Sequence, residues 1–373
     1  MNRFIGKAGL CAALMLILLA PCALASERID VVAADGTVLE GKLDLPGGIP
    51  NKLVLFINGS GPNTYDNTRQ LLGHTYNYYD LFAERLTAGG AAFFRWSARG
   101  CTPDDEPPLY TRVDGEAYQT YVPETSIADV ESVIAALRAD SRLAECPIWL
   151  LGWSEGTMIA PQVAARQNAP VDGLVLCGYV NGTMAETLEW QQTGGSSMVF
   201  YRQYFDADGD GRVSQAEFDA DPCGLRAALE GVPFADLDAD GDGQLTEADF
   251  GILLAEDWRA LQDAIQRGDD EWLAENYPVQ LTSAWFDGHA RLTPNRDILP
   301  TLDLPIFILH GECDANAPVQ GASDIRAAFD ALRKENLTLR IYPDHDHDLN
   351  YAQYVVSGEL SEAFVDLFQI LTE

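Results

Sequence analysis

Ser154 lies in the pentapeptide GWSEG, which matches the pattern G-x-S-x-G. A serine hydroxyl is a weak nucleophile at neutral pH, so attack on a carbonyl carbon requires a base, and the base requires a carboxylate that orients it. Downstream, the segment ILHGECDANAPV contains Asp314, and the segment IYPDHDHDLN contains His345 and His347. A serine, an acid and a histidine in this chain order predict acyl transfer through a covalent acyl-enzyme.

The segments around these residues alternate between short apolar runs and amphipathic runs. Strands are expected at residues 29–46 (a hairpin), 52–57, 91–96, 147–153, 171–178, 305–311 and 337–343, and helices at 79–90, 126–140, 157–167 and 321–335. This alternation predicts an α/β protein with a mostly parallel sheet that is covered by helices on both faces. Ser154 then occupies a strand–turn–helix, while Asp314 and the histidines follow the ends of later strands at the same sheet edge.

The motif after the last strand resembles that of the α/β-hydrolase family. In that family it often runs Y-P-x-x-D-H-x-L, and YPDHDHDL aligns Asp346 and His347 with its end. The alignment favours His347 over His345 as the base, and the resemblance implies a triad of Ser154, Asp314 and His347. GWSEG resembles the G-H-S-E-G-G branch of bacterial esterase-like or peptidase-like members, with a tryptophan in place of the histidine.

Two further segments carry the same resemblance. INGSGPNTYDN resembles the H-G-G-G or G-S-G-P loop of esterase-like members, with Asn58 where histidine is common. The resemblance implies an oxyanion hole formed by the backbone N–H groups of Ser60 and Glu155. FRWSARG resembles the family's R-Y-D-x-R-G strand ending, and Arg99 in it is predicted to form a structural ion pair.

The regular alternation stops between the two halves of the predicted core. The resemblance to the family covers about residues 27–180 and 302–373. We therefore expect residues 26–180 and 302–373 to form the hydrolase core and residues 181–301 to form a helical cap, which the family commonly inserts after the sixth strand. A pair of EF-hand loops is predicted inside this cap, at about residues 201–267.

Two segments of the insertion match the EF-hand loop, in which oxygen ligands at alternate positions converge on one Ca²⁺ ion. The predicted ligands are Asp206, Asp208, Asp210, the Arg212 carbonyl and Glu217 in the first loop, and Asp238, Asp240, Asp242, the Gln244 carbonyl and Asp249 in the second. Val213 and Leu245 are apolar, as the pairing of two loops requires. Asp249 is shorter than glutamate, which predicts weaker ligation in the second loop. Both calcium sites are predicted to be structural, and no organic cofactor is expected.

The helices that leave the two loops are expected to differ in length. Pro222 shortens the first one. The second is predicted to be long, with an apolar face of Phe250, Leu253, Leu254, Trp258, Leu261 and Ile265. This face forms either the cap's own core or, through Trp258, part of the substrate entrance.

Residues 1–25 have the pattern of a cleavable signal peptide. Arg3 and Lys7 precede an apolar run at residues 8–20, and Ala23-Leu24-Ala25 forms an A-x-A cleavage site. A secreted or periplasmic protein without a stable membrane span after cleavage is therefore expected.

The charge of the chain excludes one class of partner. The formal net charge is −33, and residues 201–275 alone hold 20 Asp and Glu against five Arg. Such a chain repels nucleic acid, so a small acyl compound and calcium are the expected partners. Outside the leader there are five cysteines, an odd number that forms no disulfide framework.

Together these features predict a secreted serine hydrolase that acts on carboxylic esters or related acyl compounds. A prolyl-oligopeptidase-like serine peptidase is the nearest alternative, because it uses the same triad. A calcium-responsive binding protein that retains only the fold is a second alternative, and a fluorophosphonate that fails to label Ser154 would favour it.

Overall fold

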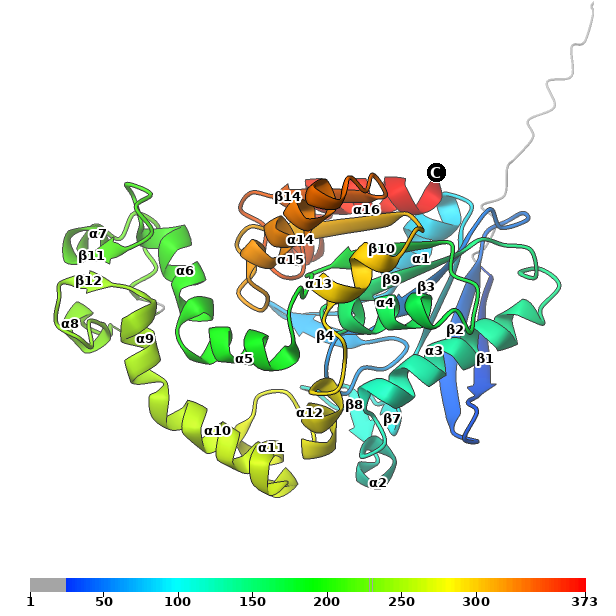
Figure 1. Ribbon diagram of the computed structural model, residues 1–373, viewed down its shortest axis with the longest axis horizontal. Helices are drawn as coiled ribbons and strands as arrows, with labels where there is room; N and C mark the ends of the chain where they lie inside the picture. The colour runs from blue at the N-terminus through cyan, green and yellow to red at the C-terminus, as the bar shows by residue number, and fades with distance from the viewer. Residues whose placement is uncertain (1–24, 228, 230) are drawn as a thin grey trace, which may run out of the picture.

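The computed structural model describes residues 25–227, 229 and 231–373. Its centre is an eight-stranded sheet in the order β1-β2-β6-β3-β9-β10-β13-β14 (Figure 1). The strands are β1 (Ala25–Val32), β2 (Val38–Leu45), β3 (Leu53–Ile57), β6 (Ala92–Trp96), β9 (Ile148–Trp153), β10 (Gly173–Cys177), β13 (Ile306–Gly311) and β14 (Leu337–Tyr342). From β6 to β14 the neighbours are parallel, whereas β1 and β2 form an antiparallel hairpin that joins β6. The predicted mostly parallel sheet is therefore confirmed.

The sheet is covered on both faces, as the continuous apolar strands require. In β3, Leu53, Leu55 and Ile57 pack into one buried cluster, while Val54 and Phe56 pack into another. The first cluster includes residues of α3 (Pro123–Arg138), α4 (Gly156–Arg166) and α14 (Val319–Leu332), and the second includes residues of α1 (Asp80–Ala88), α15 (Tyr351–Ser357) and α16 (Glu362–Thr372). These layers hold the ends of β9, β13 and β14 in fixed positions at one sheet edge.

Arg99 ties three segments of this core together. Its Nε and Nη2 donate to the two carboxylate oxygens of Asp129 on α3, at 2.8 and 2.6 Å, and its Nη1 lies 2.6 Å from Asp35 in the β1–β2 turn. The Arg99 side chain is buried. The expected structural ion pair at Arg99 is confirmed.

The insertion between β10 and β13 is helical apart from two very short strands. Its elements are α5 (Met184–Gln192), α6 (Gly195–Phe205), β11 (Val213–Ser214), α7 (Gln215–Ala220), α8 (Phe234–Leu237), β12 (Gln244–Leu245), α9 (Glu247–Leu253), α10 (Ala255–Arg267), α11 (Asp270–Asn276), α12 (Ser283–His289), α13 (Asn295–Ile298) and the 3-10 turn η1 (Leu299–Thr301). The part from α6 to α9, which we call the distal lobe, projects away from the sheet and has its own apolar core (Figure 1). Val213 pairs with Leu245 in β11 and β12, as their apolar character predicted.

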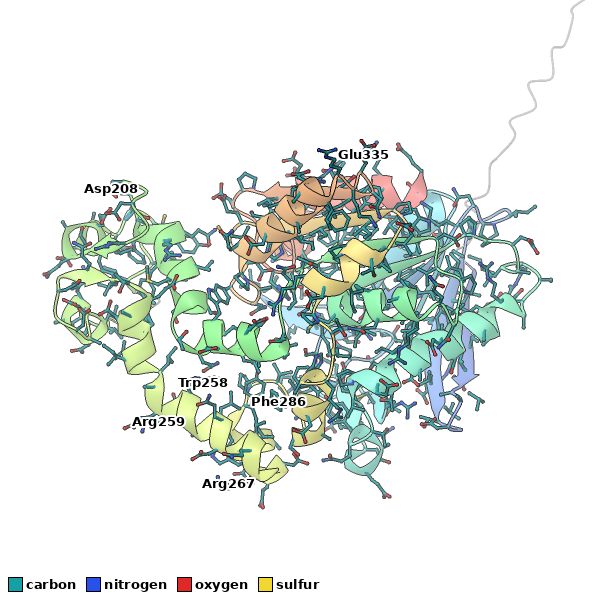
Figure 2. The ribbon with its side chains drawn as sticks, in the orientation of Figure 1. Asp208, Trp258, Arg259, Arg267, Phe286 and Glu335 are labelled. Atoms are coloured by element: carbon teal, nitrogen blue, oxygen red, sulfur yellow. The ribbon has the colours of Figure 1, made fainter. Side chains whose placement is uncertain are left out.

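Only one of the two helices that leave the loops has the predicted length. α7 ends at Ala220, just before Pro222. The predicted long second helix is instead two helices, because the chain bends at Leu254, between α9 and α10. Leu253 is 45 % exposed, so it does not belong to the predicted apolar face. Trp258 on α10 packs in the same cluster as Phe286 on α12 (Figure 2).

Some features lay outside the predictions. Two small antiparallel hairpins, β4 (Thr68–Leu71) with β5 (His74–Asn77) and β7 (Cys101–Pro103) with β8 (Thr111–Val113), and the short helix α2 (Gly115–Tyr118) were not expected. All five cysteines in the described part of the chain are free thiols. Within that part, no helix has the length and apolar character needed to cross a bilayer. The predicted signal peptide falls almost entirely outside the described residues.

Candidate active site

Ser154 occupies a sharp turn between β9 and α4. Its φ is +55°, in the left-handed region that a residue with a Cβ seldom adopts, and its backbone N–H donates to the Cys177 carbonyl at 2.9 Å. A side chain at Gly156 would collide with the carbonyl of Ile57. The second glycine of the motif therefore allows the turn to pack against the end of β3, and the strain at Ser154 is typical of a functional site.

Asp314 and His347 meet beyond the ends of β13 and β14. The Nδ1–H of His347 lies 2.8 Å from Oδ2 and 2.9 Å from Oδ1 of Asp314. Asp314 is buried and also accepts the backbone N–H groups of Asn316 and Ala317, both at 2.8 Å. The carboxylate is thus held from two sides, and it fixes the ring of His347 so that Nε2 is the free nitrogen.

The electrostatics of this pair favour a charged imidazole. Burial lowers the pKa of His347, but the charge of Asp314 and its hydrogen bond more than offset this and raise the pKa to about 9. Burial raises the pKa of Asp314, while the charge and hydrogen bond of His347 bring it below its ordinary value. Such a pair stabilises the imidazolium that forms when the histidine accepts a proton.

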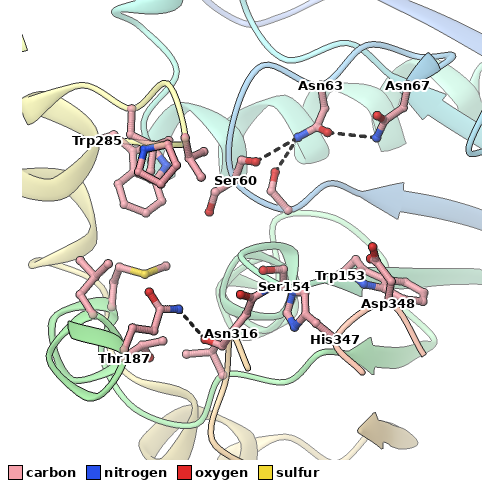
Figure 3. A pocket seen from close by; sticks show the side chains of 18 of the residues that line it. Ser60, Asn63, Asn67, Trp153, Ser154, Thr187, Trp285, Asn316, His347 and Asp348 are labelled. Carbon is pink, nitrogen blue, oxygen red and sulfur yellow. Dashed lines mark hydrogen bonds between the residues drawn. The ribbon is translucent and has the colours of Figure 1, made fainter. Parts of the chain in front are cut away.

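Ser154 and His347 line the same cavity, which has a volume of about 380 Å³. Figure 3 shows the His347 ring beside Ser154. The hydrogen bonds of the described residues do not join these two side chains, although Asp314 and His347 are bonded. Contacts between a nucleophile and its base often shorten only when a substrate is present.

The two predicted oxyanion donors are close to the serine. Ser60 lines the cavity, and a Cβ placed on the adjacent Gly59 would lie 3.0 Å from the Ser154 Cβ. Glu155 follows Ser154 directly and precedes α4. Among the described residues, the backbone N–H groups of Ser60 and Glu155 donate to no protein acceptor, which leaves both available to a bound oxyanion.

A comparison with protein-family models agrees with this geometry. Residues 54–356 match the family described as the alpha/beta hydrolase family. The chain belongs to the alpha/beta hydrolase family.

Several esterases are similar to parts or all of the chain. Esterase EstD of Thermotoga maritima is 27 % identical over 154 residues, which are 41 % of this chain and 33 % of that esterase. A carboxyl esterase from Bacillus coagulans, solved with glycerol, has a TM-score of 0.52 at 14 % identity, covering 94 % of this chain and 100 % of the esterase. An esterase of Pyrococcus furiosus has a TM-score of 0.50 at 13 % identity, covering 93 % of this chain and 91 % of that one. At these identities the structures show a shared fold.

The other histidines near the sheet edge make different hydrogen bonds, although Nε2 of His310 also lies 3.7 Å from Oδ2 of Asp314. The Nδ1–H of His345 donates to the Pro343 carbonyl at 2.7 Å. His310 is buried, and its Nδ1 accepts the backbone N–H of Tyr179 at 3.0 Å. Neither lines the cavity, so the structure pairs His347 and not His345 with Asp314 and with the serine pocket.

One wall of the cavity is polar and was not predicted from the sequence. Asn67 donates to Oδ1 of Asn63 at 3.0 Å (Figure 3). Asn63 in turn donates to the Gly59 carbonyl at 2.9 Å, and Arg69 donates to Oδ1 of Asn67 at 3.2 Å. This chain of hydrogen bonds supports the loop that contains Ser60. The asparagines of INGSGPNTYDN were visible in the sequence, but their spacing did not indicate that they would bond to one another.

The insertion supplies a second part of the lining, in which apolar residues outnumber polar ones. Its larger apolar lining residues are Met184, Leu188, Tyr277, Val279, Leu281 and Trp285, and its polar ones are Thr187, Gln191 and Gln192. Trp258, which was weighed as part of the substrate entrance, is not among the lining residues. The cavity therefore lies between the sheet edge and the insertion, and each of them contributes both polar and apolar side chains to its lining.

The predicted calcium loops bring their aspartates together. Carboxylate oxygens of Asp206, Asp208 and Asp210 lie within 4.8 Å of one another, and so do those of Asp238, Asp240 and Asp242. Oδ1 of Asp238 is buried without a hydrogen-bond partner among the described residues. Hard oxygen donors arranged in this way fit Ca²⁺.

The carboxylates at the last loop position have the same arrangement in both loops. Glu217 accepts the backbone N–H of Ala207 at 3.0 Å and of Ser214 at 2.8 Å, and Asp249 accepts that of Asp240 at 3.2 Å and of Thr246 at 2.8 Å. Each side chain thus reaches back across its loop, and its role as a ligand stays a prediction.

Proposed function

We propose that the protein is a serine hydrolase that cleaves carboxylic esters, with Ser154 as nucleophile, His347 as base and Asp314 as the acid that orients the base. One observation carries the proposal: the His347–Asp314 hydrogen bond stands at the cavity that Ser154 lines, on an alpha/beta hydrolase scaffold. The similar proteins named above are esterases, which favours ester substrates over peptides.

The proposed reaction has two halves. Ser154 Oγ attacks the carbonyl carbon while Nε2 of His347 accepts the hydroxyl proton of the serine. The resulting oxyanion accepts hydrogen bonds from the backbone N–H groups of Ser60 and Glu155. Collapse of this intermediate transfers the proton to the leaving alcohol and leaves an acyl-serine. Water then attacks the acyl carbon with His347 again as base, and the carboxylic acid is released.

The cavity bounds the substrate. Its volume of about 380 Å³ is at the lower end of the usual range for small-molecule sites, about 300–1,000 Å³. The apolar side chains that the insertion contributes suit an acyl chain, while the asparagines of the Ser60 loop suit polar atoms near the ester. We therefore infer a small acyl ester as substrate.

A matched panel of esters and peptides tests the proposal. The purified protein is assayed with nitrophenyl esters of increasing acyl length and with aminoacyl nitroanilides, and is labelled with a fluorophosphonate. We expect ester turnover, label on Ser154, and loss of both in Ser154→Ala. Ser132→Ala is the control, because the Ser132 hydroxyl bonds to the Ala128 carbonyl of its own helix α3.

Each alternative outcome has a distinct meaning. Faster cleavage of nitroanilides than of esters would replace the esterase with a peptidase. An unlabelled Ser154 in a folded protein without turnover would favour a binding protein that retains the fold. Near-normal turnover in Ser154→Ala would contradict the assignment of the nucleophile.

We further propose that the two loops of the distal lobe hold calcium, with the six aspartates, the carbonyls of Arg212 and Gln244, and Glu217 and Asp249 as ligands. When bound, calcium supplies positive charge that relieves the repulsion between the carboxylates of each loop. It takes no part in the acyl chemistry. Export by the leader at residues 1–25 belongs to the same proposal, since extracellular or periplasmic calcium then has access to the loops.

A further inference from the structure

The side chain of Glu155 is buried beside the nucleophile and accepts three hydrogen bonds. Its side chain is 1 % exposed. Oε1 accepts from Nε1 of Trp285 and from Nε2 of His289, both at 2.9 Å, and Oε2 accepts from the Tyr121 hydroxyl at 2.8 Å. A carboxylate only accepts and an indole only donates, so the donors and the acceptor are matched. The proposed oxyanion hole uses only the backbone N–H of this residue and gives no reason for such a side-chain network.

The three donors come from two separate segments. Trp285 and His289 lie on α12 of the insertion, where their rings pack with centroids 4.1 Å apart and are both almost fully buried. Tyr121 lies between α2 and α3 of the core. Glu155 therefore joins the insertion to the core at the residue that follows Ser154.

The same network approaches the second oxyanion donor. The Tyr121 hydroxyl lies 3.4 Å from the carbonyl of Gly59, the residue before Ser60. A hydroxyl has one proton, and the shorter contact with Glu155 takes it, so Gly59 is held here by packing. Tyr121 consequently touches both segments whose N–H groups are the proposed oxyanion donors.

We propose that Glu155 is a positioning residue through which α12 of the insertion and Tyr121 set the geometry of the oxyanion hole. The side chain anchors its own backbone N–H, and Tyr121 keeps the Ser60 loop in register with it. A buried carboxylate with all its donors in place rigidifies its surroundings, whereas a missing donor leaves a buried charge that moves or takes up water. This inference rests on the proposed ester hydrolysis and assigns its oxyanion geometry to a side chain outside the triad.

Two neighbouring tyrosines provide a matched test. Tyr118 stacks on Tyr121, with ring centroids 5.5 Å apart, but its hydroxyl donates to the Gln280 carbonyl at 2.6 Å and does not bond to Glu155. Tyr121→Phe and Tyr118→Phe therefore each remove one tyrosine hydroxyl oxygen, but only Tyr121→Phe removes a hydrogen bond to Glu155. Glu155→Ala and Glu155→Gln form a second pair, because glutamine keeps an oxygen for Trp285 and His289.

The readouts separate positioning from simple destabilisation. For each variant, kcat is measured per active site by burst titration on a nitrophenyl ester, together with KM and melting temperature. The inhibition constant of a trifluoromethyl ketone is also measured, since Ser154 adds to that ketone and forms an oxyanion. One oxyanion donor contributes about 10²–10³ in kcat, so we expect kcat to fall about tenfold in Tyr121→Phe and about 10² in Glu155→Ala, with KM unchanged. The inhibition constant rises by the same factors, and Glu155→Gln restores most of the loss.

The two tyrosine variants distinguish a positioning role of Glu155 from a purely structural one. Tyr118→Phe is expected to lower the melting temperature while kcat per site stays within about twofold of wild type. If Tyr121→Phe also lowers only the melting temperature, and its affinity for the ketone is unchanged, the network is structural only and the inference is wrong. The comparison of the two tyrosine variants remains decisive even if Glu155→Ala does not fold. A wild-type protein without ester turnover would overturn the proposed function and this inference with it. An active wild type whose kcat is unchanged by Tyr121→Phe and Glu155→Ala would overturn the inference alone.

Discussion

Oδ2 of Asp314 lies 2.8 Å from Nδ1 of His347, although 33 residues separate them in the chain. His345, two residues away, directs its Nδ1–H to the Pro343 carbonyl, and its ring lies against Tyr342. In an extended segment, residues i and i+2 would point to the same side, but this segment is a turn, so the partner of each ring follows only from the folded loop. The bond to Asp314 makes His347 the base in the proposed reaction.

The two histidines provide the first prediction. His347→Ala should lower kcat/KM for esters by at least about 10³, since loss of a triad member typically costs several orders of magnitude. His345→Ala should change it by less than about tenfold, because His345 does not line the cavity. Steady-state kinetics on one nitrophenyl ester measure both. An inactive His345→Ala beside an active His347→Ala would reverse the assignment.

The raised pKa of His347 provides the second prediction. The base must be neutral to accept the serine proton, and its pKa is raised to about 9, so kcat/KM should increase with pH and reach half its maximum near pH 9. The profile is measured with an ester whose groups do not ionise, alongside an NMR titration of the His347 ring in Ser154→Ala. A midpoint near the ordinary histidine value of 6.5 in both measurements would contradict it.

The raised pKa of His347 also makes the free energy of unfolding depend on pH. The folded pKa of His347 exceeds the unfolded value, so protonation stabilises the fold. This contribution is fully present below pH 6.5 and is lost as pH rises through about 9. Unfolding by urea between pH 6 and 10 should therefore show a falling free energy of unfolding, and Asp314→Asn should flatten that slope, because it removes the charge that raises the pKa.

The sequence predicted the scaffold well because its signals are local. Apolar runs such as KLVLFI and the glycines around Ser154 each specify a strand or a turn within a few residues. The loop of Ser60 and the positions of Asp314 and His347 followed from motifs attached to strand ends.

The features that escaped prediction depend on distant segments. Glu155 and His289 are 134 residues apart, and no periodicity relates them. The bend at Leu254 was hidden because residues on both sides of it favour a helix. The small hairpins β4–β5 and β7–β8 have few apolar residues, so their alternation gives a weak signal.

Two arginines provide the third prediction. Arg99→Met leaves the buried carboxylate of Asp129 without its partner, which should destabilise the fold by about 3–5 kcal/mol. Arg142 makes a comparable bidentate contact with Glu27, but both side chains are exposed, so Arg142→Met should cost less than about 1 kcal/mol. Urea unfolding of both variants measures the difference. Equal costs would mean that burial does not decide the value of these pairs.

Calcium provides the fourth prediction. The aspartates of each loop repel one another, and binding of Ca²⁺ should relieve this repulsion and stabilise the distal lobe. Each tenfold excess of free calcium over the dissociation constant should add about 1.4 kcal/mol to the free energy of unfolding of whatever unit unfolds with the loops. Chelation should accordingly lower the melting temperature. Calorimetric titration of the whole chain should give two binding events, the tighter one assigned to the first loop, because Glu217 is longer than Asp249.

The variants for this test differ in whether the carboxylate belongs to a loop. Glu217→Gln should weaken the tighter event and reduce the calcium-dependent rise in melting temperature. Asp219→Asn is the control, since Asp219 pairs with Arg226 on the lobe surface and is not a predicted ligand. An absence of binding heat together with an unchanged melt would overturn the calcium sites. Binding that alters ester turnover sharply while the melt stays constant would instead make calcium a regulator, because the α5 wall of the cavity is continuous in sequence with α6 of the lobe.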